Sequence, residues 1–147
     1  IHSRIAKGTI IPPHQDNAYY GLENGKALTF YIPLNYQNPL DGGLRYLKNN
    51  INNEFDHDLS SEKGFSLTIK NNEDIKSLRT IDLAYEPGDC SVHHSRSVHY
   101  AEAVPPNTLR GLVLRMSFFA SSEKQKTNHL KWYEMIVKKN RFENLQD

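Results

Sequence analysis

Short apolar runs rich in β-branched and aromatic residues alternate along this chain with clusters of Gly, Pro and Asn. This alternation is typical of antiparallel β-structure, in which each strand is short and a turn follows it. The predicted strands lie at residues 4–11, 27–34, 43–48, 80–85, 90–94 and 109–119. We therefore expect a mainly β fold, either a sandwich or a double-sheet jelly roll.

Two turn signals and one polar segment divide these strands. Asp41-Gly42-Gly43 is predicted to close a hairpin, and Pro87-Gly88-Asp89 to start the strand that leads towards His99. Residues 49–72 are too polar for a core segment, and they are read either as a lid or binding loop or as surface decoration. Residues 128–139 are the exception to the β pattern, because they predict one amphipathic helix near the C-terminus. Its apolar positions are Leu130, Tyr133, Ile136 and Val137.

Composition excludes several classes of function. The length of 147 residues predicts a single domain, and 37% apolar residues with a mean hydropathy of −0.68 predict a thin core, so that a partner or further segment could cover an exposed face. A net charge of +1 argues against nucleic acid or an anionic membrane as partner and favours a small-molecule substrate. Cys90 is the only cysteine and no apolar run is long enough to span a membrane, so we expect a reducing, cytoplasmic location.

Three side chains have the types of a non-haem iron site. His14 and Asp16 are two residues apart, so a strand would project both from one face, and His99 from another strand could supply a third ligand. Two histidines and one carboxylate form a facial triad that holds Fe(II) and leaves three positions open. Those positions can take a bidentate 2-oxo acid and dioxygen. The pattern predicts His14, Asp16 and His99 as metal ligands.

An arginine eleven residues after His99 completes the pattern. Arg110 is a candidate partner for the far carboxylate of a co-substrate such as 2-oxoglutarate. A guanidinium suits this task because its rigid fork makes two parallel charge-assisted hydrogen bonds to a carboxylate.

These motifs together resemble the phytanoyl-CoA dioxygenase family of Fe(II)/2-oxoglutarate oxygenases. The resemblance covers about residues 11–119 and rests on Pro13-His14-Gln15-Asp16, Asp41-Gly42-Gly43-Leu44, Pro87-Gly88-Asp89, His99 and Arg110. It implies a double-stranded β-helix, or cupin-like jelly roll, with Fe(II), 2-oxoglutarate and O2 as cofactor and co-substrates. It also implies that His14, Asp16 and His99 bind iron, that Arg110 binds 2-oxoglutarate, and that Gln15 lies close to the co-substrate.

Other residues compete for these roles. His93 or His94 could replace His99 as the distal ligand, but the spacing from Asp89 favours His99 and leaves the other two with supporting roles. Arg45, Arg96 and Arg115 compete with Arg110. Arg115 shares the last predicted strand, where an odd separation points the two side chains to opposite faces. Only one of them can then face the metal unless a bulge intervenes. The tyrosines at 19, 20 and 31 are read as core residues or as pocket lining.

The chain departs from the family pattern at three places. Ala101 stands where a small hydroxyl residue usually helps the arginine, and Lys48-Asn49-Asn50 stands where a Gly-Ser-His ending is usual. His14 also comes only thirteen residues after Ile1, whereas family members carry an N-terminal region of helices and a strand before this point. We therefore expect residues 1–147 to form one jelly-roll domain that lacks that region.

The expected reaction is hydroxylation of a small molecule, coupled to conversion of 2-oxoglutarate into succinate and CO2. Asp16 favours this outcome, because halogenating relatives replace the carboxylate with a small residue. Two rival interpretations remain. One is a metal-binding jelly roll without oxygenase activity. The other is a zinc hydrolase that uses the same triad to activate water, but it needs a general base beside the metal and gives Arg110 no task.

Overall fold

The computed structural model describes residues 2–3, 10–62, 67–105 and 111–143, with side chains as far as Ile136 in the last helix. In chain order the elements are β1 (His2–Ser3), β2 (Ile11–His14), α1 (Asn17–Tyr20), β3 (Ala27–Pro33), the 3₁₀ helix η1 (Pro39–Asp41), β4 (Arg45–Leu47), β5 (His57–Leu59), β6 (Leu67–Ile69), α2 (Glu73–Lys76), β7 (Thr80–Asp82), β8 (Ser91–His94), β9 (Val98–Ala101), β10 (Leu112–Phe119) and α3 (His129–Glu143).

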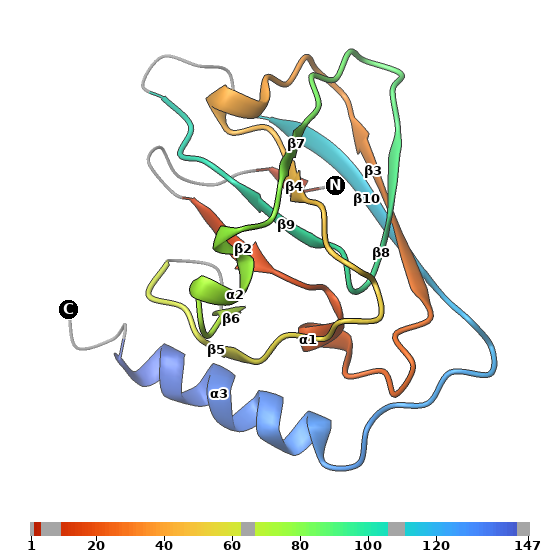
Figure 1. Ribbon diagram of the computed structural model, residues 1–147, viewed down its shortest axis with the longest axis vertical. Helices are drawn as coiled ribbons and strands as arrows, with labels where there is room; N and C mark the ends of the chain where they lie inside the picture. The colour runs from red at the N-terminus through yellow and green to blue at the C-terminus, as the bar shows by residue number, and fades with distance from the viewer. Residues whose placement is uncertain (1, 4–9, 63–66, 106–110, 144–147) are drawn as a thin grey trace.

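Two four-stranded antiparallel sheets form the body of the fold (Figure 1). One sheet has the strand order β1-β10-β3-β8 and the other β2-β9-β4-β7, while β5 and β6 form a separate two-stranded sheet. The chain passes from one large sheet to the other between strands that are close in sequence, as in a jelly roll. The expected mainly β, double-stranded β-helix fold with one long C-terminal helix is confirmed.

The predicted strands agree with the structure in their order and differ in their limits. The strands predicted at 27–34, 43–48, 80–85 and 90–94 each contain an observed strand, and that predicted at 109–119 contains β10. The strand predicted at 4–11 meets β2 only at Ile11, since residues 4–9 lie outside the described residues. The turn at Gly42 is real, with φ of 89°, but it does not close a hairpin. It links β3 to β4, which belong to different sheets.

The polar segment 49–72 contributes core residues, contrary to expectation. Leu67 and Ile69 on β6 are buried, and Ile69 packs with Ile75 of α2 and Val98 of β9. Val98 and Leu47 are register partners on one face of their sheet, and His99 and Tyr46 are partners on the other. This apolar cluster therefore supports the outer face of the sheet whose inner face carries the histidine.

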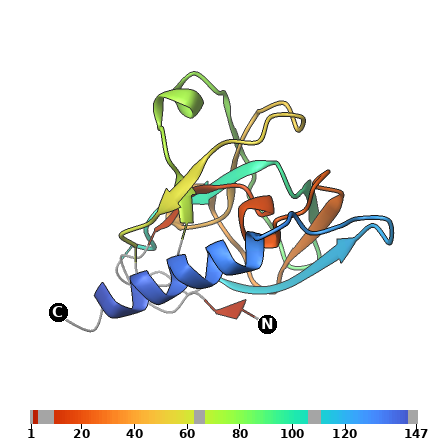
Figure 2. The same ribbon diagram turned by 90° about the horizontal axis from the view of Figure 1, so that it is seen from below.

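Helix α3 lies across one end of the two sheets (Figures 1 and 2). The His129 ring bonds to the Tyr19 carbonyl at 3.1 Å, and the Tyr133 ring meets the Tyr19 ring edge-on. Gly21 ends α1 with φ of 63°, and a side chain there would collide with the His129 ring. The helix predicted at 128–139 is confirmed, although Leu130 is 57% exposed and does not belong to a buried face. The side chain of Val137 lies outside the described part of the helix.

The outer face of the β10-β3-β8 sheet is apolar and open to solvent. Leu28, Val92, Met116 and Phe118 are all exposed there, and the Phe118 ring meets the Phe30 ring edge-on. Within the described residues, no helix combines the length and apolar character that a membrane crossing requires.

Candidate metal centre

His14 and Asp16 meet at the end of a strand, where the chain changes direction. β2 is irregular between Ile11 and His14, as expected of a strand in which Pro12 and Pro13 have no N–H to donate. Asp16 lies beyond the strand in a helical conformation, at the N-cap position of α1, and its side chain makes no capping hydrogen bond. The predicted i, i+2 strand geometry is therefore wrong for Asp16. The turn after His14 brings the carboxylate to the same interior point.

His99 stands directly opposite His14 on the neighbouring strand β9. The Nε2 atoms of His14 and His99 lie 3.9 and 3.7 Å from Oδ1 of Asp16. All three residues are buried, and their ligand atoms lie within 4.8 Å of one another. Within the described part of the chain, this is the group that could hold a metal ion. The three residues predicted as ligands thus come together.

The tautomers of His14 and His99 suit metal binding. Nδ1 of His14 lies 2.8 Å from the Pro12 carbonyl, and Nδ1 of His99 lies 3.0 Å from the Ser97 carbonyl. A carbonyl only accepts, so each Nδ1 carries the proton and each Nε2 presents a lone pair. Burial lowers the pKa of both rings, that of His99 well below its usual value, which keeps them neutral. Neutral, oriented imidazoles are the form that metals bind.

Asp16 is held in its ionised form. Thr29 donates to its Oδ2 at 2.9 Å, and His93 Nε2 lies 3.3 Å from the same oxygen. An Arg115 Nη2 donates to Oδ1 at 2.5 Å. Burial alone would raise the pKa of Asp16, but the His93 hydrogen bond and the charge of Arg115 oppose it, and the pKa is held well below its usual range.

Arg115 is the arginine that the described residues bring to the triad. It pairs with Tyr31 across β10 and β3, on the inner face that also carries Thr29 and Ser117. Burial opposes its charge, but Asp16 and Tyr20 raise its pKa on balance. Arg110 lies outside the described residues, so its proposed role stays a prediction. The sequence analysis ranked Arg115 below Arg110 because the sequence alone does not fix the position of the strand. That position decides whether its odd- or even-numbered residues point inwards.

The other competing residues have partners of their own. Arg45 bonds to Asp82 and Glu102 on the outer face, and Arg96 pairs with Glu54. His94 is partly exposed. His93 adjoins Asp16 but does not join the metal-capable group. Thr29 was missed by the sequence analysis, although its place between Ala27 and Tyr31 in a strand of alternating burial could have indicated it.

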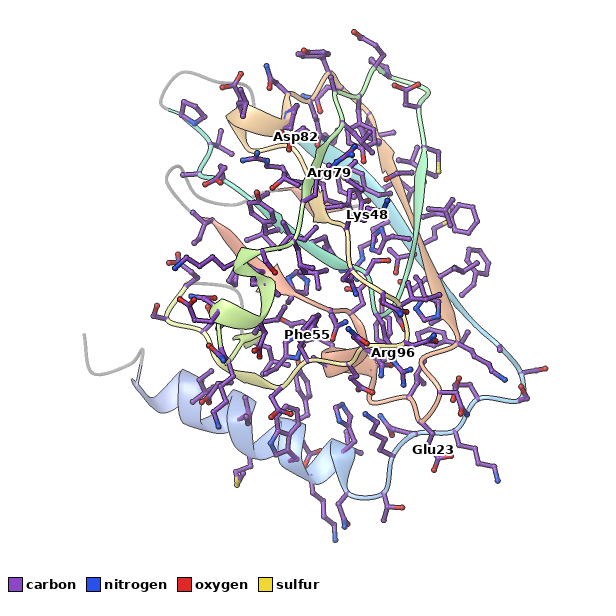
Figure 3. The ribbon with its side chains drawn as sticks, viewed as in Figure 1. Glu23, Lys48, Phe55, Arg79, Asp82 and Arg96 are labelled. Atoms are coloured by element: carbon purple, nitrogen blue, oxygen red, sulfur yellow. The ribbon has the colours of Figure 1, made fainter. Side chains whose placement is uncertain are left out.

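Gln15 has a well-defined structural role. Its side chain is fully buried and bonds to the carbonyls of Asn53 and Arg96 and to the N–H of Phe55. Figure 3 shows Phe55 and Arg96 near α1, where these bonds tie the polar segment to the sheet. The expected place of Gln15 beside the co-substrate stays a prediction. Ala101 is buried opposite Ile11 and offers no hydroxyl.

His57 extends the buried polar structure behind β2. Its Nε2 accepts from the backbone N–H of Gln15 at 3.0 Å, and its Nδ1 donates to the Phe55 carbonyl at 2.8 Å. Burial, only partly opposed by the bond to Phe55, lowers the pKa of His57 to about 4. Sequence reasoning gave this histidine no role, because it lies in the polar segment.

His57 should make stability depend on pH. Its pKa is lower in the folded chain than in the unfolded chain, so the unfolded chain takes up the proton first as the pH falls. Its contribution is therefore complete above about pH 6.5 and is lost as the pH falls towards 4, by on the order of 3 kcal/mol. We expect urea unfolding at pH 7, 5.5 and 4 to show a smaller loss for His57→Asn than for the parent chain. Equal losses would contradict this account.

Comparison with known proteins gives one family and several structures. The model of the family "Phytanoyl-CoA dioxygenase (PhyH)" matches residues 2–110. No curated protein sequence gave a match. The chain is similar to the epimerase SnoN in complex with Fe3+, alpha ketoglutarate and nogalamycin RO (17% identity, TM-score 0.63, 85% of this chain and 48% of SnoN). It is also similar to the non-heme monooxygenase ThoJ (18%, 0.64, 81% and 43%). A third is EvdO2 of Micromonospora carbonacea var. aurantiaca complexed with 2-oxoglutarate (21%, 0.59, 82% and 49%). The chain therefore spans less than half of each of these structures.

Proposed function

Because the chain belongs to the phytanoyl-CoA dioxygenase family, we propose that it acts as an Fe(II)- and 2-oxoglutarate-dependent oxygenase. The observation that carries the proposal is the buried group of His14, Asp16 and His99 at the interior end of a jelly roll. The proposed reaction hydroxylates a small molecule and converts 2-oxoglutarate and O2 into succinate and CO2.

The donor set fits iron. Two neutral imidazoles and one ionised carboxylate occupy a single face of an octahedron, and a metal bound there keeps three positions for other ligands. In this family, bound iron and the oxo acid together supply the oxidising chemistry. The protein orients the reactants and excludes water from the site. His14 and His99 hold their lone pairs towards Asp16 through their Nδ1 bonds to backbone carbonyls. At neutral pH, none of the three side chains has to lose a proton before it binds a metal.

A guanidinium is proposed to bind the far carboxylate of 2-oxoglutarate. Arg110 is the residue that the family pattern indicates, and Arg115 is the one that the described inner face presents. Arg115 lies in the sequence Arg115-Met116-Ser117, so the Ser117 hydroxyl on the same face could donate to the same carboxylate. That hydroxyl lies 2.8 Å from Tyr20 and 3.1 Å from Thr29. It could replace the hydroxyl that Ala101 lacks.

Hydroxylation is the finer part of the proposal. Asp16 occupies the position that halogenating relatives leave small, which favours transfer of oxygen. The structures to which the chain is similar include an epimerase and a monooxygenase, so the fold alone does not choose between these reactions. The zinc-hydrolase alternative is less well supported, because the metal-capable group of the described residues includes a single carboxylate, which is itself a ligand.

An anaerobic titration with Fe(II) and 2-oxoglutarate tests the proposal. We expect a visible metal-to-ligand charge-transfer band in the parent chain, and succinate release when O2 and a substrate are added. Replacing the arginine that binds the carboxylate should weaken 2-oxoglutarate binding by about 10- to 100-fold, since it removes two charge-assisted bonds. Fe(II) affinity should not fall in Arg115→Ala, because the change removes a positive charge beside Asp16.

Three variants show which arginine binds the far carboxylate of 2-oxoglutarate: Arg115→Ala, Arg110→Ala and Arg79→Ala. Arg79 is exposed, lies immediately before β7 and serves as the control (Figure 3). A loss confined to Arg115→Ala or to Arg110→Ala identifies the binding residue. Bound iron without a charge-transfer band in the parent chain would contradict the oxygenase proposal and favour a metal-binding jelly roll without this activity.

A further inference from the structure

A chain of hydrogen bonds leads from the protein interior to the carboxylate of Asp16. His93 on β8 is buried, and each of its ring nitrogens has a partner. Nε2 lies 3.3 Å from Oδ2 of Asp16, and Nδ1 lies 3.1 Å from the Tyr46 hydroxyl. That hydroxyl lies 2.9 Å from Oγ of Ser91, which accepts from the Tyr85 hydroxyl at 2.9 Å. The four links connect strands of both large sheets.

For an uncharged His93 ring, the inventory of donors and acceptors sets the position of every proton in this series of hydrogen bonds. An ionised carboxylate only accepts, so Nε2 of His93 must carry the proton. In an uncharged ring, Nδ1 is then an acceptor, and the Tyr46 hydroxyl must donate to it. Tyr46 has no second proton, so Ser91 must donate to Tyr46, and Ser91 in turn accepts from Tyr85. The direction of the whole chain is thereby set, from Tyr85 towards Asp16.

We infer that His93 is a positioning residue. The hydrogen bonds from Tyr85 through Ser91 and Tyr46 lock its ring as the Nε2–H tautomer, and the ring then holds Oδ2 of Asp16 away from the metal. The inference rests on the proposed function of the site. Thr29 donates to the same oxygen, so Oδ2 has two donors, while Oδ1 accepts from Arg115 and faces the Nε2 atoms of His14 and His99. A carboxylate held in this way binds a metal through one oxygen. Were it free to rotate, both oxygens could bind and take a position that the co-substrate needs.

This role differs from that of a ligand. The His93 ring is close to the His99 ring, with centroids 4.6 Å apart, yet its Nε2 points to the carboxylate. Residues that orient metal ligands typically change metal affinity by 10- to 100-fold when they are removed. The inference therefore predicts an effect on metal binding without direct contact with the metal.

The first test reads the tautomer in the metal-free chain. Long-range ¹⁵N–¹H correlation spectra distinguish Nε2–H from Nδ1–H rings and from doubly protonated rings. We expect His93 to be Nε2–H in the parent chain and a mixture of tautomers in Tyr46→Phe, which removes only the hydroxyl. An Nδ1–H or doubly protonated ring in the parent chain would overturn the inference.

The second test compares Fe(II) affinity in two substitutions of His93. In His93→Gln the side-chain amide can still donate to Asp16, whereas His93→Leu removes the donor. We expect about 10- to 100-fold weaker binding in His93→Leu and near-parent binding in His93→Gln. His94→Leu, at the neighbouring position of β8, is the control and should bind Fe(II) like the parent chain. Equal losses in the Gln and Leu variants would indicate a packing role only.

The outcomes separate this inference from the proposed function. If the parent chain binds Fe(II) but shows no charge-transfer band, the oxygenase proposal fails while the tautomer and the affinity series still decide the role of His93. If the band appears and both His93 variants bind Fe(II) as the parent does, the positioning role fails and the oxygenase proposal stands. Should His93→Leu not fold, the tautomer spectra and the comparison of His93→Gln with Tyr46→Phe remain decisive.

Discussion

Replacement of Asp16 with asparagine is expected to weaken Fe(II) binding by more than about 100-fold, the upper end of what loss of a ligand's supporting residue costs. Asp16 supplies the only negative charge within the triad, and its Oδ1 faces both histidine Nε2 atoms. Asparagine has nearly the same shape but is neutral, so the imidazoles would bind the metal without a compensating charge. The measurement is an anaerobic competition titration of Fe(II) against a chromophoric chelator.

The matched control is Asp58→Asn. Asp58 is exposed on β5, where its carboxylate accepts from the N–H of Leu59. This variant should bind Fe(II) like the parent chain. Circular dichroism of both variants establishes that they are folded. Parent-like affinity in Asp16→Asn would show that other side chains hold the metal, and the assignment of the triad would then be wrong.

Gln15→Leu is expected to lower the free energy of unfolding by about 2–5 kcal/mol. Leucine fills a similar volume but cannot replace the amide, so the Phe55 N–H and the Asn53 carbonyl lose their partner in a partly buried place. Each such buried polar group costs about 1–3 kcal/mol. The Arg96 carbonyl loses less, because Asn49 also donates to it at 2.9 Å. Urea unfolding of the metal-free chain measures the change.

Gln125→Leu provides the comparison for this prediction. Gln125 is exposed and donates to the Tyr20 carbonyl, so its replacement should cost no more than about 1 kcal/mol. Unchanged unfolding of Gln15→Leu would mean that the three bonds contribute nothing. If folded Gln15→Leu also binds 2-oxoglutarate more weakly than the parent chain, Gln15 has the co-substrate role that the family pattern implies as well.

The chemistry of the candidate site could be predicted from sequence further than its geometry. His14, Asp16 and His99 were recognised because few side-chain sets suit a non-haem iron, and the structure brings these three together. The reason given for the first pair was wrong, since Asp16 lies past the end of β2. Where a strand ends depends on packing and on irregularities such as those around Pro12, which a pattern of period two does not contain.

The remaining misses have a similar cause. Leu67 and Ile69 flank Thr68 in a three-residue strand, and so short an alternation is hidden by the polar residues around it. The choice between Arg110 and Arg115 depended on where the last strand begins and which of its faces turns inwards. The role of His57 became visible only through its partners, because an isolated histidine in a sequence has no preferred role. His93 was given a supporting role from the sequence, but only the structure identifies Asp16 as its partner.

The direct pairing of His14 with His99 has a thermodynamic consequence. These residues face each other across β2 and β9, so a one-residue slip between the strands would turn one imidazole out of the site. A metal bound by both histidines would therefore stabilise this strand register and no other. At a free Fe(II) concentration 100 times the dissociation constant, linkage adds about 2.7 kcal/mol to folding stability. Iron supply would then govern how long the chain survives proteolysis as well as whether it can react.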